Sequence, residues 1–273
     1  MSRIQKVVLH HWGYKNQQFN VDRLVIHHRP RTTDEKVINE VLVKHAYQKR
    51  SIGFMIESDD CWLDLGANIG TFSLLALSVG ARVVAVEPEP ENLELLKMNL
   101  EENFPAKDTV GAVGSWRIIG RAVVNELRSV RYAHAKGAQR PERSELVKLY
   151  LCNGDYNKYR HTLYHKRGRE SIEVLAISIR ELLERYPDID AVKMDIEGTE
   201  IDLLESMTAD DFKNINKLVF EYSFDFDPSI PRFMNIINTL RKTFDNVHFT
   251  KVDETQATYK YFPPCTNVFC WND

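Results

Sequence analysis

From Cys61 onward, short apolar runs alternate with amphipathic helical segments along the chain. The first run, residues 62–67, is interrupted only by Asp64, and the segment behind it places apolar side chains at helical spacing. The same order of a short apolar run and an amphipathic segment returns several times. Such alternation is typical of a mostly parallel sheet with helices on both faces.

Seven runs have the length and apolar content of strands, and together they predict a seven-stranded sheet. They are residues 62–67, 82–86, 116–124, 191–196, 218–222, 247–252 and 259–271. The last two follow each other without an intervening helix, which predicts an antiparallel C-terminal hairpin on an otherwise parallel sheet.

The remaining pattern divides the chain into an appendage and a main domain. Residues 1–58 form the predicted appendage, with two short strands followed by a helix. Residues 59–273 form the predicted domain, and a polar insertion around residues 125–170 interrupts its alternation. A long irregular insertion in a compact domain is usually functional or disordered.

Composition narrows the class of protein without naming it. The 273 residues are 43% apolar and 27% charged, which is globular composition, and the net charge of −3 gives no overall basic field for DNA. The four cysteines form no C-x-x-C pair, so a zinc site is not expected. Scattered cysteines instead favour a reducing compartment, and we expect a cytoplasmic location. No signal peptide and no membrane-spanning run is found. Nothing in the pattern points to an oligomeric state.

The sharpest motif is the glycine-containing turn of residues 64–70, D-L-G-A-N-I-G, between a predicted strand and a predicted helix. In an open parallel sheet the ligand lies beyond the carboxyl ends of the strands. We expect Gly66 to let the backbone approach a ligand, and Gly70 to let the helix begin close to the strand.

A carboxylate at the end of the next strand suggests the ligand. Glu87 follows Gly66 by 21 residues, a spacing that suits hydrogen bonds to ribose hydroxyls. The glycine pattern of dinucleotide sites is incomplete here, and Asp64 would repel a diphosphate but attract an ammonium or sulfonium group. This combination favours S-adenosylmethionine as the cofactor.

A second motif, residues 192–200 (V-K-M-D-I-E-G-T-E), lies where another buried strand leads into a helix. Asp195 is expected at the ligand edge, where a carboxylate can accept a hydroxyl proton, with Glu197 assisting. The alternative is a helix cap with a structural Lys–Asp contact. His165 or His161 is an alternative base, because histidine titrates near neutrality.

Taken together, the segments WLDLGANIGTFSLLA, AVEPEPENLELLKMNL, DAVKMDIEGTEIDLL and LVFEYS resemble the FkbM family of S-adenosylmethionine-dependent methyltransferases. The resemblance spans residues 61 to about 222, and the K-x-D-x-E-G piece is its most discriminating part. It implies a class I (Rossmann-like) methyltransferase fold and O-methylation of hydroxyls on sugars, glycans or related small molecules. The long, charged segment 125–147 and the pair His161-Thr162 depart from the family pattern.

The resemblance also implies a cofactor site. The residues that it places at the methionine end are Asp64, Gly66, Ala67, Asn68 and Gly70. Glu87 would hold the ribose, Pro88 would lie against the adenine, and Asn125 would reach the adenine amino group.

Three alternatives stay open at the level of the sequence. A bound Mg²⁺ held by Asp195, Glu197 and Glu221 would activate the acceptor. The basic, tyrosine-rich segment 156–170 suits a glycan, a solvated loop or, less well, RNA. A domain that binds the cofactor without catalysis would carry the same motifs.

Overall fold

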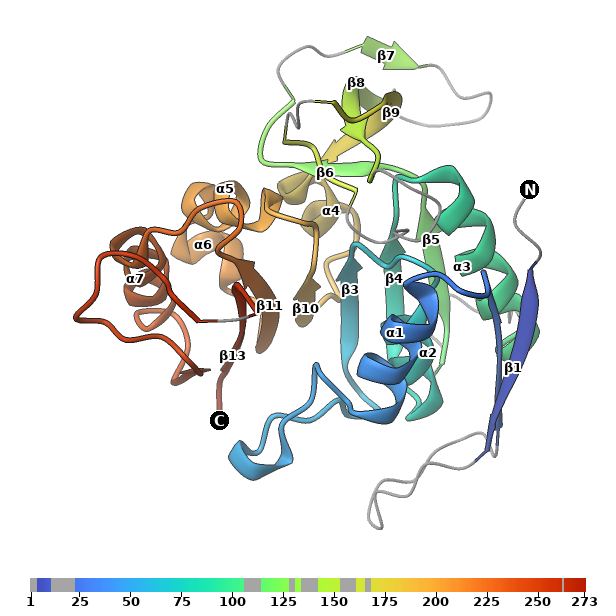
Figure 1. Ribbon diagram of the computed structural model, residues 1–273, viewed down its shortest axis with the longest axis horizontal. Helices are drawn as coiled ribbons and strands as arrows, with labels where there is room; N and C mark the ends of the chain where they lie inside the picture. Colours follow the sequence, from blue (N-terminus) through green and yellow to red (C-terminus); the bar gives the residue numbers. More distant parts are fainter. Residues whose placement is uncertain are drawn as a thin grey trace.

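A computed structural model describes residues 4–10, 23–105, 114–127, 131–133, 142–152, 161–164, 168–261 and 263–273. Its centre is a seven-stranded sheet (Figure 1). In spatial order the strands are β12 (Asn246–Phe249), β13 (Cys265–Trp271), β11 (Lys217–Ser223), β10 (Ala191–Met194), β3 (Cys61–Leu65), β4 (Arg82–Val86) and β5 (Trp116–Ile119). β13 runs antiparallel to β12 and to β11, and the other neighbouring strands pair in parallel. The predicted class I methyltransferase fold, with its antiparallel C-terminal hairpin, is therefore confirmed.

Helices cover both faces of this sheet, because alternate residues of each strand point to opposite faces. On one face Leu63, Met194 and Phe220 join an apolar cluster with the helices of the C-terminal half. Those helices are α4 (Ile179–Arg185), α5 (Thr199–Ser206), α6 (Ala209–Phe212) and α7 (Ile230–Leu240). On the other face Trp62 and Ala85 pack with the N-terminal elements and with α2 (Thr71–Ser78) and α3 (Pro90–Asn103).

The N-terminal appendage shares this second cluster. It contains the antiparallel pair β1 (Gln5–His10) and β2 (Arg23–His28), then α1 (Asp34–Ile38), the π-helical turn η1 (Asn39–Val43) and the 3₁₀ turn η2 (Arg50–Ile52). Its residues Ile26, Leu42 and Phe54 are almost fully buried in the same cluster as Trp62 and Phe72. The appendage and the sheet thus share one core.

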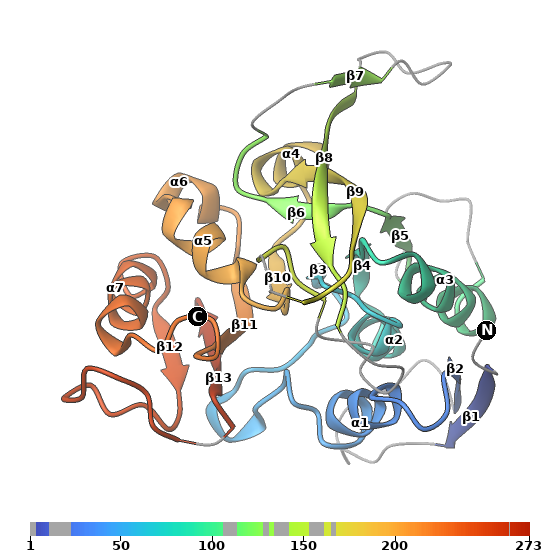
Figure 2. The same ribbon diagram turned by 45° about the horizontal axis from the view of Figure 1, so that its top comes forward.

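The predicted strand 116–124 is wrong as a single element. The chain turns after β5, with the Arg121 amide donating to the Ile119 carbonyl at 3.0 Å, and β6 (Ala122–Val124) leaves the central sheet. It joins a second sheet of order β6–β9–β8–β7, with β9 at Ser171–Ser178, β8 at Glu142–Tyr150 and β7 at Arg131–Ala133. Figure 2 shows this sheet beyond the ends of β3 and β10. Ala122 is buried in the small apolar cluster of this second sheet, whereas Val123 packs in the cluster of the central sheet.

Two of these strands, β7 and β8, lie within the predicted polar insertion. β8 extends over nine residues, although its sequence carries few apolar positions. Among the described residues, no helix combines the length and apolar character that crossing a membrane requires.

Candidate functional site

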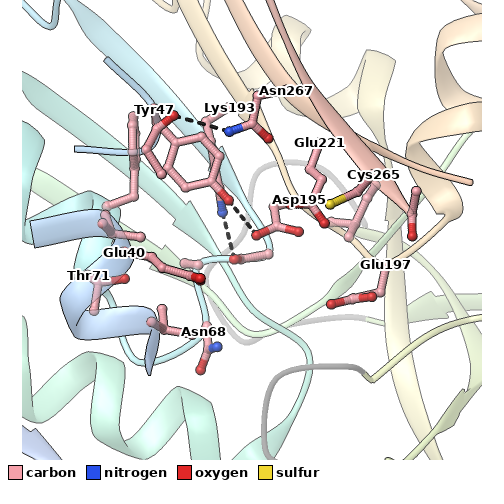
Figure 3. Close-up of a pocket in the computed structure, with 18 of the residues that line it drawn as sticks. Glu40, Tyr47, Asn68, Thr71, Lys193, Asp195, Glu197, Glu221, Cys265 and Asn267 are labelled. Carbon is pink, nitrogen blue, oxygen red and sulfur yellow. Dashed lines mark hydrogen bonds between the residues drawn. The ribbon is translucent and has the colours of Figure 1, made fainter. Parts of the chain in front are cut away.

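A cavity of about 850 Å³ opens at the carboxyl ends of β3, β4, β10 and β11 (Figure 3). Its volume lies within the range of small-molecule sites, and its position is where ligands bind in open α/β sheets. One side is formed by the turn after β3 and the end of β4, and the other by the turn after β10 and the start of β13. Residues 44–49 of the appendage line it as well.

The turn after β3 is held tightly between its neighbours. The amides of Gly66 and Ala67 both donate to the Val86 carbonyl at 3.0 Å. Gly66 has φ +75°, and a Cβ at this position would lie 1.9 Å from the Asp195 carbonyl oxygen. The contact that requires glycine is therefore with the end of β10, and not with a ligand as the sequence suggested. Gly70 (φ +90°) lies behind the turn, where a Cβ would meet Leu96 of α3.

Asn68 and Glu87 form a polar cradle on this side of the cavity. The Asn68 amide donates to Glu87 Oε2 at 2.8 Å, and the Glu89 amide donates to Oε1 at 2.9 Å. Burial raises the pKa of the Glu87 carboxyl to about 7. Asn68 Oδ1 is buried and has no hydrogen-bond partner among the described residues. Pro88 lines the cavity beside Glu87.

These groups fit S-adenosylmethionine. The Glu87 carboxylate can accept hydrogen bonds from ribose hydroxyls, and the unpartnered Asn68 oxygen needs a donor that a ligand would supply. Ala67 and Gly66 also line the cavity at this point, so the backbone of the turn faces the ligand as well.

Asp64 lies beneath the turn and does not line the cavity. Its Oδ1 is 3.1 Å from Lys193 Nζ, and its Oδ2 accepts a hydrogen bond from Ser73 at 2.7 Å. Lys193 also donates to the Gly66 carbonyl at 2.9 Å. Burial alone would lower the pKa of Lys193, but the carboxylates of Asp64 and Asp195 outweigh it and raise that pKa. The pair fixes the turn to β10.

Asp195 follows β10 and lines the cavity next to the turn. The Tyr47 hydroxyl donates to Asp195 Oδ2 at 2.6 Å, and the Tyr47 ring lies 5.4 Å from Lys193 Nζ (Figure 3). Burial and the Asp195 carboxylate raise the pKa of Tyr47 well above its usual value, so it stays a donor. Sequence reasoning missed Tyr47, because no motif surrounds it.

Glu197 and Glu221 line the same part of the cavity as Asp195. Glu197 has φ +53°, and its carbonyl accepts a hydrogen bond from the Thr162 hydroxyl at 2.7 Å. Among the described residues, one group of three carboxylates is close enough to share a metal ion: Glu57, Asp59 and Asp60. That group lies before β3, at the opposite end of the strands, where Lys217 pairs with it. The geometry therefore gives no support to an Mg²⁺ site at Asp195, Glu197 and Glu221.

Asn125, like Asp64 and Gly70, is a predicted site residue that does not line the cavity. Asn125 follows β6, lies outside the cavity lining, and accepts a hydrogen bond from the Glu126 amide at 2.8 Å. His165 and most of the segment 156–170 lie outside the described residues. His161, the other histidine considered as a base, does line the cavity.

A doubly wound sheet with a polar cradle at its switch point is typical of an α/β protein of the methyltransferase type. The family model described as "Methyltransferase FkbM domain" matches residues 64–247. The chain belongs to this family and is a methyltransferase. Family membership implies that the methyl group comes from S-adenosylmethionine.

Individual relatives are distant. The chain is 24% identical to "Methyltransferase sdnD" of Sordaria araneosa over 222 residues, which is 73% of this chain and 79% of that protein. It is 32% identical to "Ribosomal RNA large subunit methyltransferase E" of Archaeoglobus fulgidus over 114 residues, which is 35% of this chain and 60% of that protein.

Solved structures are similar only in outline. A precorrin-6y C5,15-methyltransferase from Geobacter metallireducens aligns with 90% of this chain and 93% of its own, at 12% identity and a TM-score of 0.42. A fibrillarin/Nop5p complex aligns with 94% of this chain and 88% of its own, at 10% identity and a TM-score of 0.44. The fold assignment therefore rests on the sheet order and the family match.

Proposed function

We propose that the protein transfers the methyl group of S-adenosylmethionine to a hydroxyl of a polyhydroxylated acceptor such as a sugar, with Asp195 as the proton acceptor. The pair of Tyr47 and Asp195 on the cavity wall carries this proposal. Tyr47 occupies Oδ2 of the carboxylate, so Oδ1 can accept a hydrogen bond from an acceptor hydroxyl. A carboxylate in that position can take the proton that the attacking hydroxyl loses.

The backbone around Asp195 supports this role. Its amide donates to the Leu65 carbonyl at 3.1 Å, and its own carbonyl packs against Gly66. Asp195 and the turn after β3, which we call the cofactor turn (residues 66–70), are thus fixed relative to each other. Bound S-adenosylmethionine supplies an electrophilic methyl group on a sulfonium. Holding the acceptor hydroxyl in line with that methyl is expected to provide most of the rate acceleration.

The surroundings of Asp195 support a hydroxyl-rich acceptor. Glu197, Glu221 and Asn267 line this part of the cavity and offer oxygens and an amide that can hydrogen-bond several hydroxyls. The same carboxylates disfavour a phosphate backbone close to the transfer point. We therefore prefer a sugar-like acceptor to RNA, although the name of one relative refers to ribosomal RNA.

The test is transfer from a deuterated-methyl cofactor to sugars, hydroxylated small molecules and an RNA oligonucleotide, detected by mass spectrometry. Asp195→Asn is expected to lower transfer by about 100-fold or more, because it removes the base. Tyr47→Phe should lower kcat by about tenfold and leave KM for the cofactor unchanged, because it removes a hydrogen bond to a charged group. Binding of S-adenosylhomocysteine, measured by calorimetry, should be the same in both variants and the unaltered protein.

Three other outcomes of these experiments would contradict parts of the proposal. Full turnover by D195N would exclude Asp195 as the base. Labelling of the RNA alone would overturn the acceptor class. Cofactor binding without labelling of any acceptor would favour a domain that binds without catalysis.

A further inference from the structure

The position of Asp64 leaves one requirement of the cofactor unmet. The methionine end of S-adenosylmethionine carries an ammonium group, and the sequence assigned Asp64 to it. Asp64 is fully buried, ion-paired to Lys193 and absent from the cavity lining. Its charge is already balanced by Lys193, so acceptor oxygens for the ammonium have to come from other groups that line the cavity.

Glu40 is a carboxylate that lines the cavity from the appendage. It lies in η1, where the Lys44 amide donates to the Asn39 carbonyl at 2.9 Å and closes a π-helical turn. Single π-turns are frequent at functional sites. Figure 3 shows the Glu40 side chain on the side of the cavity where Asn68 of the turn after β3 and Thr71 at the start of α2 lie.

The partners of Glu40 leave it able to bind a ligand. Its ion pair with Lys36 spans 3.7 Å, and the two side chains are 43% and 56% exposed. Such pairs contribute little and are easily exchanged. On the facing turn, Asn68 Oδ1 is buried without a hydrogen-bond partner among the described residues. The two residues therefore offer acceptor oxygens from two elements that line the cavity, η1 and the turn after β3, which suits a group with three donor hydrogens.

We infer that Glu40, together with Asn68, binds the ammonium group at the methionine end of S-adenosylmethionine. The inference rests on the proposed function for the identity of the cofactor. It gives the N-terminal appendage a direct part in cofactor binding, from a residue outside the range that matches the family.

The test compares two ligands by isothermal titration calorimetry. S-adenosylhomocysteine carries the ammonium group, whereas 5′-methylthioadenosine keeps the nucleoside and lacks the amino-acid end. Glu40→Gln should weaken binding of S-adenosylhomocysteine about tenfold and leave 5′-methylthioadenosine unchanged. Glu101→Gln is the matched control, because it also breaks an exposed i,i+4 pair of 3.7 Å, with Lys97, on α3. It should change neither affinity.

Two results with E40Q would overturn the inference. One is wild-type affinity for S-adenosylhomocysteine. The other is an equal loss for both ligands, which would mean that Glu40 only supports the fold. If the unaltered protein failed to bind S-adenosylhomocysteine, the cofactor assignment would fall together with this inference. An active D195N variant with normal binding would overturn the assigned base alone.

Discussion

Two buried carboxyls near the cavity have strongly raised pKa values. Burial raises the pKa of Glu87 to about 7 and that of Glu200 to about 8. Both side chains accept backbone hydrogen bonds, Glu200 from the Gly198 amide and Glu87 from Asn68 and Glu89. Because their folded-state pKa values exceed the ordinary value of 4.5, the stability that they contribute at low pH is lost progressively as pH rises from about 4.5 to the folded pKa values of about 7 and 8.

Glu87 should make cofactor binding pH-dependent. Below pH 7 its carboxyl is protonated, and above pH 7 it is ionised and accepts hydrogen bonds from ribose hydroxyls more strongly. Affinity for S-adenosylhomocysteine is therefore expected to rise between pH 6 and pH 8. Glu87→Gln should bind about tenfold more weakly at pH 8, with a flatter profile. Calorimetry across this range checks the prediction, and an identical slope in E87Q would contradict it.

At the scale of elements, the turn after β3 is defined by what packs on it. Three neighbours hold it: the end of β4 through Val86, the end of β10 through Asp195, and α3 through Leu96. The glycines of the motif are therefore explained by contacts within the protein.

Substituting two glycines separately distinguishes the free-energy cost of backbone strain from that of steric overlap. Gly53 and Gly66 both have positive φ, but a Cβ at Gly53 meets no atom within 4 Å. Gly53→Ala should cost only the left-handed backbone penalty of about 1–2 kcal/mol. Gly66→Ala should cost clearly more, because its Cβ overlaps the Asp195 carbonyl oxygen. The free energy of unfolding in urea measures both, and equal losses would show that the overlap relaxes at no cost.

The sequence predicted those elements whose pattern reflects local burial. β3, β4, β10 and β11 are short, mostly apolar runs, and the turns behind β3 and β10 carry recognisable motifs. The division of residues 116–124 into two strands was missed, because both halves are apolar and only the tertiary partner differs. Tyr47 and Glu40 were missed for a related reason: their role depends on where the appendage folds back, which no local pattern encodes.

At the scale of the whole molecule, the buried side chain of Asn99 connects the appendage to the turn after β3. Asn99 of α3 accepts a hydrogen bond from the His27 amide at 2.6 Å. Its Nδ2 donates to the His27 carbonyl at 3.1 Å and to the Ile69 carbonyl at 2.7 Å. One asparagine therefore links β2, α3 and the cofactor turn.

Asn99→Ala should lower the melting temperature of the entire protein and weaken binding of S-adenosylhomocysteine, because it leaves buried backbone groups unsatisfied. Asn103→Ala is the matched control, since Asn103 bonds the backbone of Val25 in β2 but does not reach the turn. It should lower the melting temperature and leave binding unchanged. Differential scanning calorimetry should show one unfolding transition in both variants. A separate transition at lower temperature would mean that the appendage unfolds independently.

The order β12–β13–β11 has a consequence for synthesis. β12 leaves the ribosome before β13, yet its place in the sheet is against β13 and not against β11. Until residues 265–271 emerge, β12 has no partner and the edge of β11 remains open. Nascent chains stalled in between are expected to expose unpaired strand edges, which favour aggregation and chaperone capture.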